Sequence, residues 1–106
     1  MAAGSMIRVK SRDGFEFDAY RVAAQGPRKG GVIVIQEIFG LSDHIKEMTE
    51  RFGAAGYEAI APSMYDRVQR GFHAEHDEAG IAEAFKTVRA ANPADALADM
   101  QATINL

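Results

Sequence analysis

The side chains best suited to chemistry follow two apolar segments of this chain. Glu37 comes after the run Val32–Ile35, and Tyr65, Arg67 and Arg70 come after a second apolar segment that a proline closes. If both segments are parallel strands, these side chains lie beyond the strands' carboxyl ends, where α/β sheets bind ligands. An arginine there could hold a substrate carboxylate through two hydrogen bonds, and the alternative is a solvated basic loop. For Glu37 the alternative is a solvated glutamate, or one paired with an arginine.

Two other kinds of chemistry have little support in the sequence. His73 and His76 are three residues apart, but no helical pattern surrounds them and no third ligand is evident, which favours a surface loop over a metal site. Cysteine is absent, and no serine stands in a Gly-x-Ser-x-Gly setting, so these residues contain no recognisable nucleophile. No metal or organic cofactor is predicted.

The composition is that of one globular domain or part of one. The chain has 106 residues, 47% of them hydrophobic, and a formal net charge of −3. This composition excludes a disordered chain and gives no general attraction to nucleic acid or anionic membranes. No apolar run approaches the ~18 residues that span a bilayer, and residues 1–6 lack the apolar core of a signal peptide. We therefore expect a cytoplasmic protein in which residues 1–5 are a leader outside the fold.

Alternation of polar and apolar residues predicts an antiparallel hairpin at the start of the chain. Residues 6–10 and 15–20 both alternate, with Ser11-Arg12-Asp13-Gly14 between them. The pair Asp13-Gly14 suits the positive φ angles of a tight turn. The hairpin should therefore have one polar face and one buried face.

The next segment predicts a pair of parallel strands joined by a helix. Gly31–Ile35 is apolar on both faces, as in a central strand that helices cover on both sides. Ser42 is a suitable cap for a helix that ends at Gly56, with apolar positions at Ile45, Met48, Phe52 and Ala55. A second buried strand follows over Tyr57–Pro62. Strand, helix and strand of these lengths form a right-handed βαβ unit.

Two further helices are predicted near the end of the sequence. Asp77 is a suitable cap for the first, whose apolar positions are Ile81, Ala84, Phe85 and Val88. Asn92 and Pro93 are typical of the start of the second, whose apolar stripe is Leu97, Met100 and Ile104. The sequence stops while this stripe is still running, which indicates an incomplete domain.

One motif carries a resemblance to a known family. The segment Gln36-Glu37-Ile38-Phe39-Gly40 is followed at similar spacing by Ala54-Ala55-Gly56-Tyr57 and by Ala61-Pro62-Ser63-Met64-Tyr65, and together they resemble the dienelactone hydrolase family. The likeness runs from Ile7 to Leu106. It implies that residues 6–106 are the N-terminal half of a single α/β-hydrolase domain, with strands in the spatial order 1-2-4-3. It also implies a carboxymethylenebutenolidase-type hydrolase of ester or lactone bonds.

The resemblance assigns roles to two residues of the motif. Glu37 matches the glutamate that controls the family's nucleophile, and the Ile38 backbone amide matches one oxyanion-hole donor. The nucleophile, the acid and the histidine of the family's triad lie beyond these 106 residues, so the chain alone is expected to be inert. The family arginine that binds the dienelactone carboxylate falls near Gly80-Ile81, where this chain has no charge, so dienelactone itself is in doubt as the substrate.

Two other interpretations stay open. The chain could be a small non-catalytic α/β module that holds a ligand above residues 36–42, or one chain of a two-chain hydrolase. The expected partners are an ester or lactone substrate and either the missing half or a second copy, which would pair with the free edge of the strand at Gly31–Ile35. Neither nucleic acid nor a membrane is expected as a partner.

Overall fold

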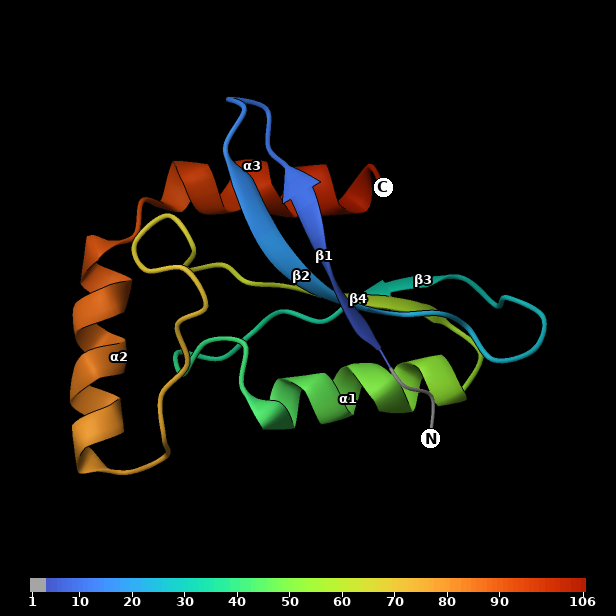
Figure 1. Ribbon diagram of the computed structural model, residues 1–106, viewed down its shortest axis with the longest axis horizontal. Coiled ribbons are helices and arrows are strands. Elements are labelled where there is room, and N and C mark those ends of the chain that lie inside the picture. Colours follow the sequence, from blue (N-terminus) through green and yellow to red (C-terminus); the bar gives the residue numbers. More distant parts are fainter. Residues whose placement is uncertain (1–3) are drawn as a thin grey trace.

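The chain folds into a four-stranded mixed sheet with three helices. The computed structural model describes residues 4–106. Figure 1 shows α1 (Asp43–Ala54) and α3 (Pro93–Ile104) on opposite sides of the sheet, and α2 (Glu78–Ala90) standing beside it. The strands are β1 (Ser5–Lys10), β2 (Glu16–Val22), β3 (Gly31–Ile33) and β4 (Glu58–Pro62). The predicted α/β class is confirmed.

The predicted strand order is confirmed, with one correction. The spatial order is β1-β2-β4-β3, in which β1, β2 and β4 pair antiparallel and β3 pairs parallel with β4. Within residues 4–106, β3 is an edge strand and not a central one. It is also shorter than the predicted Gly31–Ile35: the Val34 N–H still donates to Ile60 O at 2.9 Å, but Ile35 is 48% exposed. The two-faced apolar pattern predicted a strand with neighbours on both sides, whereas within residues 4–106 β3 has the free edge that the order 1-2-4-3 gives it.

The hairpin forms where it was predicted, although its turn is wider. Ser11 N–H donates to Phe15 O at 2.8 Å, and Phe15 N–H donates to Asp13 Oδ1 at 3.1 Å. Of the two residues Asp13 and Gly14, only Gly14 adopts a positive φ, of 92°, so Asp13 does not share the left-handed conformation expected of the pair. The first strand begins at Ser5, inside the segment expected to be a leader; residues 1–3 of that segment lie outside the described residues.

Helix α1 begins and ends as its sequence predicts. The Ile45 N–H donates to the Ser42 Oγ at 3.5 Å, which caps the first turn. At the other end Gly56 has a φ of 101°, and Tyr57 N–H donates to Phe52 O at 3.1 Å, the hydrogen bond that closes a left-handed helix end.

The buried face of α1 is rotated from the predicted stripe. Ile45 is buried as expected, but the residues that follow it into the interface are Thr49 and Gly53. A Cβ atom at Gly53 would lie 2.3 Å from Val22 Cγ1, so the glycine lets the helix approach β2 closely. The larger Phe52 packs at the rim of this contact, against Val22 and Ala59.

Helices α2 and α3 have the predicted caps but not the predicted buried faces. Asp77 accepts from Gly80 N–H at 2.7 Å, and Asn92 accepts from Ala94 N–H at 2.9 Å. The predicted apolar positions are nevertheless largely exposed, namely Ile81, Phe85 and Val88 of α2 and Leu97 and Ile104 of α3. Of the predicted positions in α2, Ala84 is buried as expected. The other buried residues are small or polar: Gly80 and Thr87 in α2, and Asp99 and Thr103 in α3. No helix within residues 4–106 is long and apolar enough to cross a membrane.

Candidate functional site

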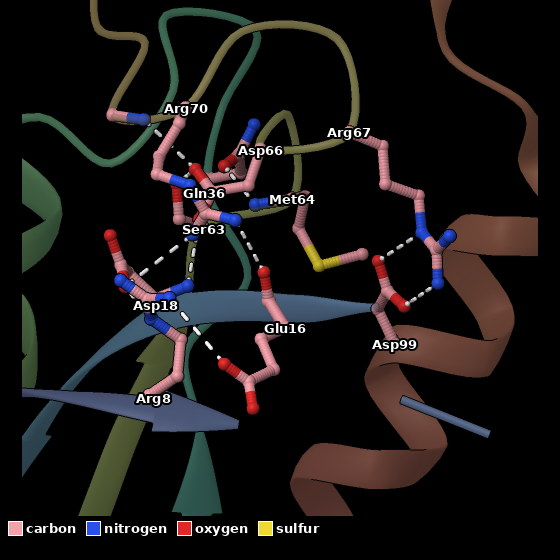
Figure 2. Close-up of polar contacts among 11 residues, drawn as sticks. Arg8, Glu16, Asp18, Gln36, Ser63, Met64, Asp66, Arg67, Arg70 and Asp99 are labelled. Carbon is pink, nitrogen blue, oxygen red and sulfur yellow. Dashed lines mark hydrogen bonds and ion pairs between the residues drawn. The ribbon is translucent and has the colours of Figure 1, made fainter. Parts of the chain in front are cut away.

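The predicted catalytic loop lies directly after β3, at its carboxyl end. The side-chain oxygen of Gln36 accepts a hydrogen bond from the Met64 N–H at 2.8 Å (Figure 2), which joins this loop to the segment after β4. One residue later, Glu37 O accepts from Gly40 N–H at 3.1 Å, so the loop closes on itself. The two segments that carry the predicted site residues are thus neighbours, as parallel β3 and β4 require.

The Glu37 carboxylate and the Ile38 backbone N–H have no hydrogen-bond partners within the described residues. The Glu37 side chain is exposed, and among residues 4–106 its carboxylate makes no hydrogen bond or ion pair. The Ile38 N–H likewise has no hydrogen-bond acceptor within the described residues. A free carboxylate can take a proton, and a free backbone N–H can stabilise a negatively charged oxygen.

A second segment, residues 72–76, packs against this loop. Ala74 N–H donates to Phe39 O at 2.8 Å, and Gly40 forms a bridge with His73. A Cβ atom at Gly40 would lie 2.2 Å from Phe72 O, and Gly40 has a φ of 84°, so this close contact requires glycine. His76, which the sequence suggested only as a doubtful metal ligand, meets the Phe39 ring edge-on at 4.0 Å between centroids. The described residues contain no group of three side chains suited to a metal ion.

Asp66 joins three separate segments through one buried carboxylate. Its Oδ2 accepts from Asp18 N–H at 2.7 Å, and its Oδ1 accepts from Ser63 Oγ at 2.7 Å and from Gly71 N–H at 2.9 Å (Figure 2). The side chain is fully buried, and Arg70 approaches it at 3.5 Å. Burial of a carboxylate costs little when hydrogen bonds satisfy it, as they do here.

Arg67 lies between two carboxylates. Its guanidinium donates to both oxygens of Asp99, at 2.9 and 3.1 Å, and to both oxygens of Asp13, at 2.7 and 2.9 Å. It also stacks 4.5 Å from the centroid of Phe15. Hydrogen bonds from Arg67 hold the pKa of Asp13 well below its ordinary range, and the two carboxylates raise the pKa of Arg67. The arginine therefore ties the hairpin turn to α3.

Arg70 and Tyr65 also have partners within the fold. Arg70 donates to the backbone oxygen of Glu16 at 2.6 Å and lies 3.7 Å from the Asp18 carboxylate. Tyr65 is buried and packs edge-on against Phe72, and burial raises the pKa of its hydroxyl. In Figure 2, Arg67 points toward Asp99 and away from the Gln36 loop.

Sequence reasoning missed the residues that hold the loop. Neither Asp66 nor Gly71 was among the predicted site residues, although the three-residue spacing from Ser63 to Asp66 is typical of a side-chain-stabilised turn. The contact of residues 72–76 with Phe39 had no local signal, since it joins segments more than 30 residues apart.

Two hollows of the described surface lie along α3. One hollow, of about 900 Å³, lies between α3 and the hairpin. Lys10 and Arg12 line one side of it, and Leu97 and Ala102 line the other. The second, of about 400 Å³, lies between α3 and β3. Both follow from the incomplete cover that α3 gives to its face of the sheet.

Comparisons with known proteins agree with this architecture. The sequence profile of the dienelactone hydrolase family matches residues 17–106. A protein of Synechocystis sp. provisionally named a carboxymethylenebutenolidase is 45% identical over 73 residues, which are 69% of this chain and 30% of that protein. A protein of Saccharolobus solfataricus with the same provisional name is 44% identical over 55 residues, 52% of this chain and 21% of that protein.

Solved structures extend the likeness to nearly the whole chain. The crystal structure of a provisionally named dienelactone hydrolase from Klebsiella pneumoniae has a TM-score of 0.69 and 32% identity, over 95% of this chain and 42% of that one. A dienelactone hydrolase-like promiscuous phosphotriesterase from metagenomic libraries has a TM-score of 0.62 and 26% identity, over 97% and 42%. The chain thus spans less than half the length of these relatives. Since the family profile covers most of its residues, the chain belongs to the dienelactone hydrolase family.

Proposed function

We propose that residues 1–106 supply the oxyanion loop of a hydrolase that cleaves carboxylic ester or lactone bonds. The observation that supports this most strongly is the loop after β3, where an unpartnered Glu37 carboxylate stands beside an unpartnered Ile38 N–H. Membership of the dienelactone hydrolase family and the names of the relatives point to the same reaction class.

The proposed reaction needs a nucleophile from outside these residues. A cysteine or serine attacks the carbonyl carbon of the substrate, and its proton passes to a nearby base, with Glu37 controlling the protonation of the nucleophile. The carbonyl oxygen becomes negative and accepts a hydrogen bond from Ile38 N–H. The C–O bond then breaks as the base returns the proton to the leaving oxygen, which departs as an alcohol from an ester or stays on the acyl group as a hydroxyl from a lactone. Water then attacks the acyl-enzyme, which releases the carboxylic acid and regenerates the nucleophile.

A substrate-contact role for Tyr65, Arg67 and Arg70 stays a prediction. Each arginine already contacts acidic side chains of the fold, and a substrate carboxylate would have to displace them. Phe39 and His76, at the loop itself, are better placed to limit the space beside the reacting carbonyl.

The test is to replace Glu37 in the natural polypeptide that carries residues 1–106. With p-nitrophenyl acetate as substrate, Glu37→Gln should lower kcat by about 100-fold, the lower range for loss of an acid–base group, and Glu37→Asp should retain more activity. The melting temperature should be unchanged because the side chain is exposed and unpartnered. A Glu37→Gln enzyme with the wild-type kcat would contradict the assignment.

The 106-residue chain by itself supplies the matching negative test. It should hydrolyse p-nitrophenyl acetate no faster than buffer with an equal amount of unrelated protein, because it contains no cysteine and no elbow serine. Turnover that a substitution of Ser11, Ser42 or Ser63 abolishes would show that the nucleophile lies within these residues and would overturn the proposal.

A further inference from the structure

We infer that Asp66 is a positioning residue for the oxyanion loop, acting through the segment Gly71–His76. The inference rests on the proposed function, because it concerns how the Ile38 N–H is held. Asp66 itself does not contact the loop. Its influence would pass through two consecutive sets of contacts, each between named groups.

The first set fixes the start of the segment. Asp66 Oδ1 accepts from Gly71 N–H at 2.9 Å, while Oδ2 accepts from Asp18 N–H in β2 at 2.7 Å. Both bonds join a fully buried carboxylate to backbone groups. The Asp66 carboxylate therefore fixes the position of Gly71 relative to strand β2, and not only relative to neighbouring residues of its own loop.

The second set carries that position to the oxyanion loop. Immediately after Gly71, Phe72 O lies so close to Gly40 that no Cβ atom fits between them. Ala74 N–H then donates to Phe39 O at 2.8 Å. Phe39 O belongs to the Phe39–Gly40 peptide, and Phe39 is the residue next to Ile38, so a shift of residues 72–74 would move the backbone that follows the proposed oxyanion donor.

Asparagine at position 66 removes one of the two backbone bonds. An amide side chain has a single acceptor oxygen, which can accept from either the Asp18 N–H or the Gly71 N–H. The NH₂ group then faces the other N–H, and two donors cannot form a hydrogen bond. Asp99→Asn is the matched control, since Asp99 is also a buried carboxylate with an arginine partner but bonds to no residue of the 71–76 segment. Both substitutions should lower the melting temperature.

The experiment measures kcat and KM of the natural polypeptide with p-nitrophenyl acetate. Asp66→Asn should lower kcat about 10- to 100-fold with KM within about twofold, as for the loss of an interaction made in the transition state. Asp99→Asn should leave kcat within about twofold of the wild type. Equal kcat losses in both variants, or an unchanged kcat in Asp66→Asn, would overturn the inference.

Amide hydrogen exchange gives a readout that does not depend on activity. The Ala74 N–H should exchange at least about tenfold faster in Asp66→Asn, while the Val34 N–H, bonded to Ile60 O in the sheet, should be unchanged. Unchanged exchange at Ala74 would also overturn the inference. If the wild type hydrolyses no ester but Ala74 still exchanges faster in the variant, the proposed function fails while the link from Asp66 to the loop stands.

Discussion

The loops after β3 and β4 differ sharply from helices α2 and α3 in how completely they are packed. In the loops, the Asp66 carboxylate is buried and fully hydrogen-bonded, and Arg67 has two acidic partners, Asp13 in the hairpin turn and Asp99 in α3. On the helices, Phe85 and Leu97 are exposed although their spacing is that of a buried stripe. The buried Asp66 carboxylate of the loops is thus satisfied within the chain, while the apolar faces of the two helices are not covered by the described residues.

The candidate site therefore does not depend on the apolar faces of α2 and α3. The Gln36–Gly40 loop is held by hydrogen bonds to Met64 and Ala74, both in the segment after β4. At Gly80 of α2 a Cβ atom would lie 1.8 Å from Glu75 O, so the first turn of this helix packs closely against the segment 72–76.

The largest effect is expected from the pair Phe17 and Phe85. Phe17 is fully buried between the hairpin and α3, whereas Phe85 is 48% exposed on α2. In the 106-residue chain, Phe17→Ala should lower the free energy of unfolding by about 3–5 kcal/mol, and Phe85→Ala by about 0.5 kcal/mol or less. Urea unfolding of both variants checks this. A cost above about 2 kcal/mol for Phe85→Ala would mean that another surface covers α2, and would contradict the difference in packing between the loops and the helices.

A smaller loss is expected when Arg67 is removed. Arg67→Met leaves the buried Asp99 carboxylate without its cation and should cost about 3 kcal/mol of unfolding free energy. Replacing Asp99 by leucine in the same chain should recover part of the loss. The control Arg51→Met removes an exposed ion pair with Glu47 and should cost less than about 1 kcal/mol. Equal costs for the two arginines would show that the Arg67 contacts do not stabilise the fold.

The smallest expected effect is a dependence on pH through Asp13. Hydrogen bonds from Arg67 lower the pKa of Asp13 in the folded state below its ordinary value of 3.8. The carboxylate therefore stabilises the fold above that pH, and this contribution is lost as the pH falls below it. The urea midpoint should decline less between about pH 6 and pH 3 in Asp13→Asn than in the wild type. Identical slopes would show that the turn is not tied to Arg67 in solution.

Local sequence signals predicted much of the fold. The caps Ser42, Asp77 and Asn92 were predicted because each side chain bonds within its own first turn. The hairpin and the strand order were also predicted, the first from alternation and the second from the family resemblance. The site loop was found because its motif is contiguous.

The remaining features depend on contacts between distant segments. Periodicity located the helices but not their buried faces, because Gly53 and Gly80 allow close approaches that large apolar residues would prevent. The partners of Arg67 lie 54 and 32 residues away in sequence, so its ion pairs could not be told from a substrate clamp. The same reason hid the bond of Asp66 to Asp18, which is 48 residues away in sequence.

The most direct test of the account is to remove the Ile38 N–H. Ile38→Pro deletes the proposed oxyanion donor, while Ile38→Val keeps it and serves as the control for the side chain. In the natural polypeptide, Ile38→Pro should lower kcat for p-nitrophenyl acetate about 10²- to 10³-fold with little change in KM, and Ile38→Val should stay close to the wild type. A folded Ile38→Pro enzyme that retains the wild-type kcat would contradict the central claim that this loop binds the oxyanion.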